Sequence, residues 1–146
     1  LHGFRVRRIS PLMVAGDLAA HFAVGLVLVL IGGREYLSVV SVSSVFIDVD
    51  HIPWLLFWPV PGRVAHSLLF LGFLSAALYL RFRRVDVIIM TSSSFLLHVT
   101  LDSLNIPVLS PLWMGRPLSI YFTPVSASIS LLLAWYTRRR YVGCGP

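Results

Sequence analysis

The feature that most constrains the fold of this chain is a series of long apolar runs separated by short breaks. The runs are Leu18 to Ile31, Tyr36 to Ile47, Ser67 to Leu80, Val85 to Leu101 and Ile120 to Tyr136. The breaks contain glycine, proline or clustered arginine, which commonly end helices. Apolar runs of more than about 10 to 12 residues favour helices over strands. No linker or internal repeat divides the sequence, so we expect one all-α domain over residues 1–146.

The balance of apolar and charged residues indicates that lipid is the solvent of these helices. The chain is 57% hydrophobic and 12% charged, with a mean hydropathy of +0.84, which leaves too little polar surface to coat a soluble domain of 146 residues. We predict an integral, multi-pass bundle of four to five helices in the cell membrane. Several runs fall short of the roughly 20 residues that cross a bilayer core, so we expect short or re-entrant segments. The stretch Ile52 to Val60 fits either a re-entrant segment or, through Trp54 and Trp58, an interfacial aromatic belt.

The basic residues are all arginines, twelve against six acidic residues. Such an excess can indicate nucleic-acid binding. Most of these arginines, however, form clusters at the ends of apolar runs, at 5–8, 81–84 and 138–140. This placement is typical of charges that stay on the cytoplasmic face and contact anionic lipid. We therefore expect membrane lipid, and not nucleic acid, as the partner.

Several ionisable residues lie in or beside the apolar runs, although a charge near the middle of a membrane helix costs about 2.5–3.5 kcal/mol. They are His21, Asp48, Asp50, His51, His66, His98 and Asp102. If consecutive runs alternate in direction, with Arg34 and the clusters at 81–84 and 138–140 on one side, all seven reach the opposite side. The N-terminal arginines then fall on that opposite side too, which leaves the absolute orientation open. Three further acidic residues at run boundaries are interpreted as capping or solvated: Asp17, Glu35 and Asp86.

The spacing of these residues suits metal binding. His98 and Asp102 are four positions apart, which places an imidazole and a carboxylate on one face of a helix. Asp48, Asp50 and His51 fall within four positions at the end of an apolar run, so one turn can present several oxygen and nitrogen ligands. Each piece also has a simpler interpretation, a hydrogen-bonded pair for the first and helix-end residues for the second. The coincidence of all pieces on one side favours a metal site.

Four motifs that contain these residues follow one another in the chain: His21-Phe-Ala-Val-Gly25, Asp48-Val-Asp50-His51, Arg63-Val-Ala-His66-Ser67 and His98-Val-Thr-Leu-Asp102-Ser103. In this order they resemble the family of small inner-membrane metal-dependent hydrolases known from a LexA-regulated bacterial member. That family is distantly similar to zinc-dependent phospholipases C and fungal single-strand nucleases, which are α-helical and hold a cluster of zinc ions. The ligands that the resemblance implies for a first zinc are one of Asp48 and Asp50, together with His66, His98 and Asp102. His21 and Asp102 would reach toward a second. The further ligands of the soluble relatives are missing after Asp102, so the residues permit one or two ions.

The chemistry that follows from such a site is hydrolysis. A zinc ion with an open coordination position lowers the pKa of a bound water from about 15.7 to near 7. Whichever of Asp48 and Asp50 is not a ligand is a candidate general base, and Arg63 is a candidate phosphate clamp. We predict a membrane-bound hydrolase that uses zinc, or another divalent metal, to cleave a phosphoester or related ester of an amphiphilic substrate such as a phospholipid. Two other classes stay open, an ion or proton transporter and a catalytically silent scaffold with a structural metal site.

Overall fold

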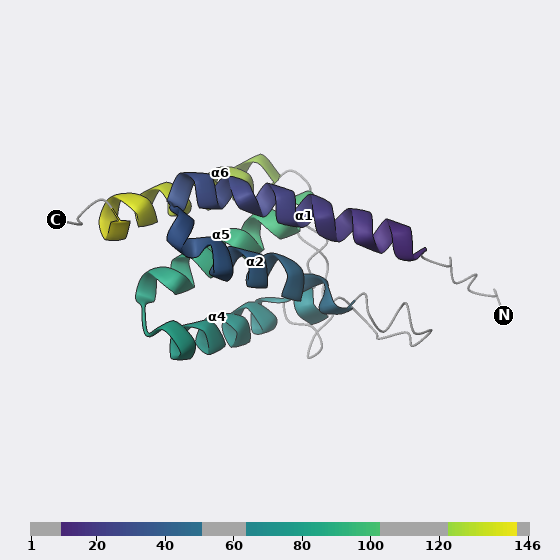
Figure 1. Ribbon diagram of the computed structural model, residues 1–146, viewed down its shortest axis with the longest axis horizontal. Coiled ribbons are helices and arrows are strands. Elements are labelled where there is room, and N and C mark those ends of the chain that lie inside the picture. Colours follow the sequence, from purple (N-terminus) through teal and green to yellow (C-terminus); the bar gives the residue numbers. More distant parts are fainter. Residues whose placement is uncertain (1–9, 51–63, 103–122, 143–146) are drawn as a thin grey trace.

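The computed structural model describes residues 10–50, 64–102 and 123–142, and all structural statements below refer to them. These residues form five α-helices: α1 (Pro11–Gly32), α2 (Leu37–Phe46), α4 (Leu68–Phe82), α5 (Val85–Leu101) and α6 (Thr123–Thr137). Short helical turns flank them: η1 (Arg34–Tyr36), η2 (Ile47–Asp50), η3 (Val64–His66) and η5 (Arg138–Val142). No strand occurs in the described ranges, which agrees with the all-α prediction (Figure 1).

Each helix contains most of one apolar run, and the largest difference lies at the start of α1. This helix begins at Pro11, whereas the apolar pattern placed its start at Leu18. Two local features explain the earlier start. The Ser10 side chain accepts a hydrogen bond from the backbone N–H of Met13 at 3.2 Å, and proline suits the first helical turn because it needs no N–H partner there. The apolar pattern did not predict this first part of the helix, because Gly16 and Asp17 interrupt it.

Helix α5 forms the centre of the bundle. It packs against α1, α2, α4 and α6, and Figure 1 shows it between α6 on one side and α4 on the other. Met90 and Phe95 of α5 are fully buried, as is Leu28 of α1. Because other helices surround α5, the residues at its two ends are held in fixed positions relative to the rest of the bundle.

The helices approach one another closely through small and hydroxyl-bearing residues. The hydroxyls of Ser44 in α2 and Ser94 in α5 are 3.1 Å apart, and Ser130 Oγ of α6 donates to the carbonyl of Ser93 at 2.7 Å. A Cβ atom added at Gly25 of α1 would lie 2.6 Å from Ser44 Oγ. Small residues and hydrogen bonds between helices are typical of helix interfaces in membranes.

The outer surface of the bundle carries many large apolar side chains. Leu30, Phe73 and Leu132 are 77%, 71% and 62% exposed. Helix α1 is long and apolar enough to cross a membrane, whereas α4 and α5 are apolar but shorter. This surface is compatible with a membrane location, and the multi-pass bundle remains a proposal.

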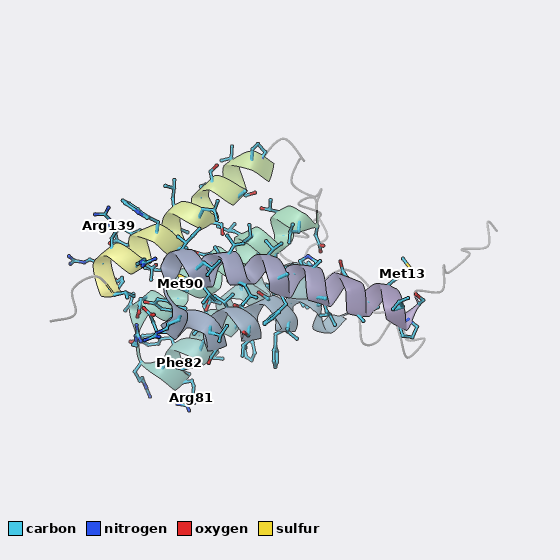
Figure 2. The ribbon with its side chains drawn as sticks, turned by 45° about the horizontal axis from the view of Figure 1, so that its top comes forward. Met13, Arg81, Phe82, Met90 and Arg139 are labelled. Carbon is cyan, nitrogen blue, oxygen red and sulfur yellow. The ribbon has the colours of Figure 1, made fainter. Side chains whose placement is uncertain are left out.

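The arginines of the bundle lie toward one end, and its described histidines, together with Asp17, Asp48 and Asp102, lie toward the other. The described arginines follow or precede helix ends: Arg34, Arg81, Arg83, Arg84, Arg138, Arg139 and Arg140. Figure 2 shows Arg81 and Arg139 toward one end of the molecule and Met13, near the start of α1, at the other. Helix α5 connects the two groups, because it follows Arg84 and ends next to Asp102. We call the end of the bundle that carries the arginines the arginine end.

Asp86 lies in the first turn of α5, where a carboxylate is favourable, but it is not solvated. It is only 2% exposed and accepts hydrogen bonds from the Tyr36 hydroxyl and the Arg84 guanidinium. The burial of Tyr36 and its hydrogen bond to Asp86 raise the pKa of the Tyr36 hydroxyl well above its usual value. The solvated alternative was wrong because η1 places Tyr36 over the first turn of α5, a contact between distant segments that the local sequence pattern does not reveal.

Candidate metal centre

Five ionisable side chains from four different elements meet at the end of α5 opposite the arginine end. His21 comes from α1, Asp48 from η2, His66 from η3 and His98 from the last turn of α5, and Asp102 caps that helix. The three histidines and Asp48 are buried, and the Asp102 side chain is 11% exposed. The alternating direction of the helices therefore brings together residues that the sequence analysis grouped on one side.

Each of the two carboxylates presents one oxygen to His21, and the other oxygen faces His66 in Asp102 and both His66 and His98 in Asp48. Asp102 Oδ1 lies 3.3 Å from His21 Nε2, and Asp102 Oδ2 lies 2.8 Å from His66 Nε2. Asp48 Oδ2 lies 3.5 Å from His21 Nδ1. Asp48 Oδ1 lies 3.2 Å from His98 Nε2 and 3.7 Å from His66 Nε2. The carboxylates thus connect the three imidazoles into one cluster.

The three imidazole rings also lie close to one another. The rings of His21 and His98 stack with centroids 3.8 Å apart, and His66 meets His98 edge to face at 5.2 Å. The Nε2 atoms of His66 and His98 are 3.3 Å apart. Two ring nitrogens that face each other need a proton or a cation between them, because their lone pairs otherwise repel.

The separations between these donor atoms suit a small cation. Ligand atoms at the zinc distances of about 2.0–2.2 Å in a tetrahedral shell lie about 3.3–3.6 Å from one another. The separations that join His98 Nε2 to Asp48 Oδ1 and to His66 Nε2 are 3.2 and 3.3 Å. Donor atoms of His66, His98 and Asp102 all lie within 4.8 Å of one another, and so do those of His21, Asp48 and His98. A buried group of histidine and aspartate residues that can hold a metal ion is therefore present, and nothing in its geometry identifies zinc.

His21 provides a separate test of whether a cation fits. Its buried Nε2 makes no hydrogen bond within the described residues, although Asp102 Oδ1 is 3.3 Å away. Its Nδ1 lies 3.0 Å from the backbone carbonyl of Asp17. A proton on Nδ1 donates to that carbonyl and leaves Nε2 as the free electron-pair donor facing Asp102, the arrangement common in metal-binding histidines. The residues therefore fit a metal ion.

Asp17 also lies at this site, although the sequence pattern predicted only a capping or solvated residue there. Its side chain is 45% exposed, with Oδ1 3.7 Å from His21 Nδ1, and Asp17, His21 and Asp102 form a third group with metal-binding spacing. The signal was available, because Asp17 precedes His21 by the same four positions that separate His98 from Asp102. It was overlooked because the helix was expected to begin after Asp17.

Small and apolar residues close the bundle side of the cluster. They leave a gap with no room for a water molecule between α1, α2 and α5, and its lining includes Val24, Gly25, Ser44, Ser94 and Leu97. Water from the bundle interior therefore does not reach His21 and His98 through this gap.

Three predicted site residues cannot be placed relative to the cluster. The backbone of Asp50 belongs to η2, but its side chain lies outside the described part of the chain, as do His51 and Arg63. Their predicted roles, ligand or base for Asp50, ligand for His51 and phosphate clamp for Arg63, stay predictions.

Comparison with known proteins gives no further support for the family resemblance. No protein-family model matches the chain, and neither a curated protein nor a solved structure matches it. Any conclusion about function therefore depends on the geometry of the cluster and on the sequence motifs.

Proposed function

We propose that this chain is a membrane-bound, metal-dependent hydrolase that cleaves a phosphoester or related ester of an amphiphilic substrate. The observation that carries the proposal is the spacing of donor atoms in the cluster. Imidazole nitrogens and carboxylate oxygens lie 3.2–3.7 Å apart around His98 and Asp48, as the ligands of a small divalent cation do.

The donor set favours zinc, bound as one or two ions. Imidazole and carboxylate ligands are typical of catalytic zinc, whereas closed structural sites usually use cysteine. The single cysteine, Cys144, lies far along the chain from these residues. His66, His98, Asp48 and Asp102 would hold one ion. His21, through the Nε2 atom that faces Asp102 Oδ1, would hold a second.

A bound zinc would supply hydroxide at neutral pH and polarise a phosphoryl or carbonyl oxygen. The chain's own residues have separate tasks. The Asp17 carbonyl orients the His21 ring through Nδ1. Because Asp48 lies among the histidines as a ligand, Asp50 is left as the candidate base that accepts the proton of the attacking water. Arg63 is the candidate clamp for an anionic phosphate.

The distribution of charge supports a membrane location with the metal centre away from the cytoplasm. An excess of arginine near helix ends marks the cytoplasmic side of membrane proteins. The arginine end would then face the cytoplasm, and the metal centre would lie toward the opposite interface, where an amphiphilic ester can reach it. In the sequence the N-terminal arginines at 5–8 precede the start of α1, which counts against this orientation.

The same distribution disfavours a transporter. A proton or ion pathway needs ionisable groups along the bundle. Between Asp86 and His98 in α5, and throughout α2, no acidic or basic residue occurs. The described ionisable residues thus lie toward the two ends and do not form a relay. A silent scaffold remains the competing explanation, and an activity assay separates the two.

The test is hydrolysis by the purified full chain of a panel of phospholipids and soluble phosphodiesters, with and without a chelator. We expect product that disappears with the chelator and returns with added zinc. His98→Ala should abolish it, whereas His2→Ala, the same change in the one histidine outside the predicted ligand set, should not. Metal bound without product from any substrate would favour the scaffold.

A further inference from the structure

A cleft at the arginine end is the strongest feature that the metal centre does not use. It has a volume of about 600 Å3 and lies between the last turn of α1 and the end of α6. Its lining consists of Leu30, Ile31, Trp135, Arg138 and Arg139. The volume is in the range of small-ligand pockets, and the lining combines apolar side chains with two guanidinium groups.

Arg138 fixes the shape of the cleft. Its Nη1 donates to the carbonyls of Leu30 at 3.2 Å and Ile31 at 3.5 Å. These carbonyls belong to the last turn of α1, where the helix itself offers no donor and a cation is favourable. Arg138 therefore ties α6 and η5 to the end of α1, and its charge is partly used in doing so.

Arg139 is the cationic group available to a ligand. Its guanidinium lies 5.0 Å from the centre of the Trp135 ring, which holds the side chain beside the cleft. Among the described residues no carboxylate forms an ion pair with Arg139, whereas Arg84 pairs with Asp86. Trp135 is half exposed and Leu30 is 77% exposed, so an apolar wall stands next to the free guanidinium.

The surroundings favour a negatively charged partner. The arginine end contains seven described arginines, whereas its described acidic residues are Glu35 and Asp86, and the second is already paired. An exposed tryptophan beside apolar residues and arginine is typical of the membrane interface, where lipid head groups lie. The ligand that matches both parts of the cleft is an amphiphile with an anionic head.

We propose that this cleft binds one anionic phospholipid, with its head-group phosphate against Arg139 and Trp135 and its acyl chains along the exposed side of Leu30. The proposal requires the membrane location proposed above and is independent of metal binding and hydrolysis. The site would hold a lipid of the leaflet at the arginine end, on the side of the membrane opposite to the metal centre, and so differs from a substrate site.

The test is native mass spectrometry of the detergent-purified full chain with phosphatidylglycerol or phosphatidylcholine added separately. We expect one phosphatidylglycerol to be retained in preference to phosphatidylcholine. Arg139→Gln should weaken this binding about fivefold, which corresponds to about 1 kcal/mol per arginine near an anionic surface. Trp135→Ala, which leaves the charge unchanged, should weaken it as well.

Arg81→Gln is the matched control, because Arg81 also lies over an aromatic ring, that of Phe82 at 5.5 Å, but does not line the cleft. Equal weakening by Arg81→Gln and Arg139→Gln would overturn the proposal and indicate general attraction to the basic surface. Equal retention of the two lipids would also overturn it. Flotation with phosphatidylcholine vesicles, checked in parallel, reports on the membrane location alone. A chain that does not float with the vesicles would refute both the membrane location and this lipid site. Circular dichroism verifies that each variant is folded.

Discussion

Replacing Gly25 with alanine is expected to destabilise the bundle, because this glycine of α1 lies directly against Ser44 and Val40 of α2. The added Cβ atom would lie 2.6 Å from Ser44 Oγ and 3.1 Å from Val40 Cγ1. The first distance is shorter than Cβ atoms tolerate, so Ser44 must rotate or the helices must separate. Rotation breaks the contact between Ser44 and Ser94, and separation moves His21, one turn earlier on α1, away from Asp48.

The size of the effect follows from three opposing contributions. Alanine gains about 1 kcal/mol over glycine inside a helix. Overpacking costs about 1–3 kcal/mol, and loss of the Ser44–Ser94 hydrogen bond costs about 0.6–1 kcal/mol. The free energy of unfolding should therefore fall by about 0.6–3 kcal/mol, which lowers the melting temperature by several degrees in a chain of this size. Metal affinity should fall with it.

Gly16→Ala is the matched control, because it makes the same change in the same helix with nothing within 4 Å of the added Cβ. Thermal unfolding in one detergent, followed by circular dichroism, should show Gly16→Ala at or above the wild-type melting temperature and Gly25→Ala below it. Adding Ser44→Ala to Gly25→Ala should recover part of the loss. Equal melting temperatures for the two glycine variants would refute the close approach of α1 and α2.

Three further results are expected. Because burial and Asp86 raise the pKa of Tyr36, folding favours the protonated phenol, so its contribution to stability is present below about pH 10 and falls as the pH rises further. Tyr36→Phe should remove this part of the alkaline loss in melting curves, and an unchanged pH profile would argue against the buried contact. Chelation should lower the melting temperature, and zinc at about 100 times its Kd should restore about 2.7 kcal/mol; no response would argue against a site in the folded state. Arg63→Ala should leave metal bound but lower turnover of an anionic ester about 10–100-fold; loss of metal would contradict its role as a clamp.

The order and type of the helices could be predicted from the sequence because each apolar run becomes one helix. The boundaries were less predictable where capping overrides hydropathy, as at Ser10 and Pro11, which start α1 well before its apolar stretch. The burial of Asp86 was not predictable, because it depends on Tyr36, which contacts it from a distant part of the chain.

The grouping of the site residues could be predicted because the alternation of helices determines which ends meet. Alternation places His66, His98 and Asp102 at one end without any knowledge of side-chain geometry. It does not determine which carboxylate oxygen faces which ring, nor that the Asp17 carbonyl accepts from His21, since those depend on helix rotation and the exact start of α1. The spacing of four positions that groups His98 with Asp102 also separates Asp17 from His21. Applied there, it would have predicted Asp17 as a site residue.

The most direct test of the metal centre is the metal content of the detergent-purified full chain, measured by elemental analysis beside that of His98→Ala and Asp102→Asn. The wild type should hold one or two zinc ions per chain, and both variants should lose most of this metal while circular dichroism shows that they remain helical. His2→Ala, which changes the one histidine outside the predicted ligand set, should keep it. A wild-type chain without metal after zinc is supplied, or the same metal content in His98→Ala as in the wild type, would contradict the proposed centre.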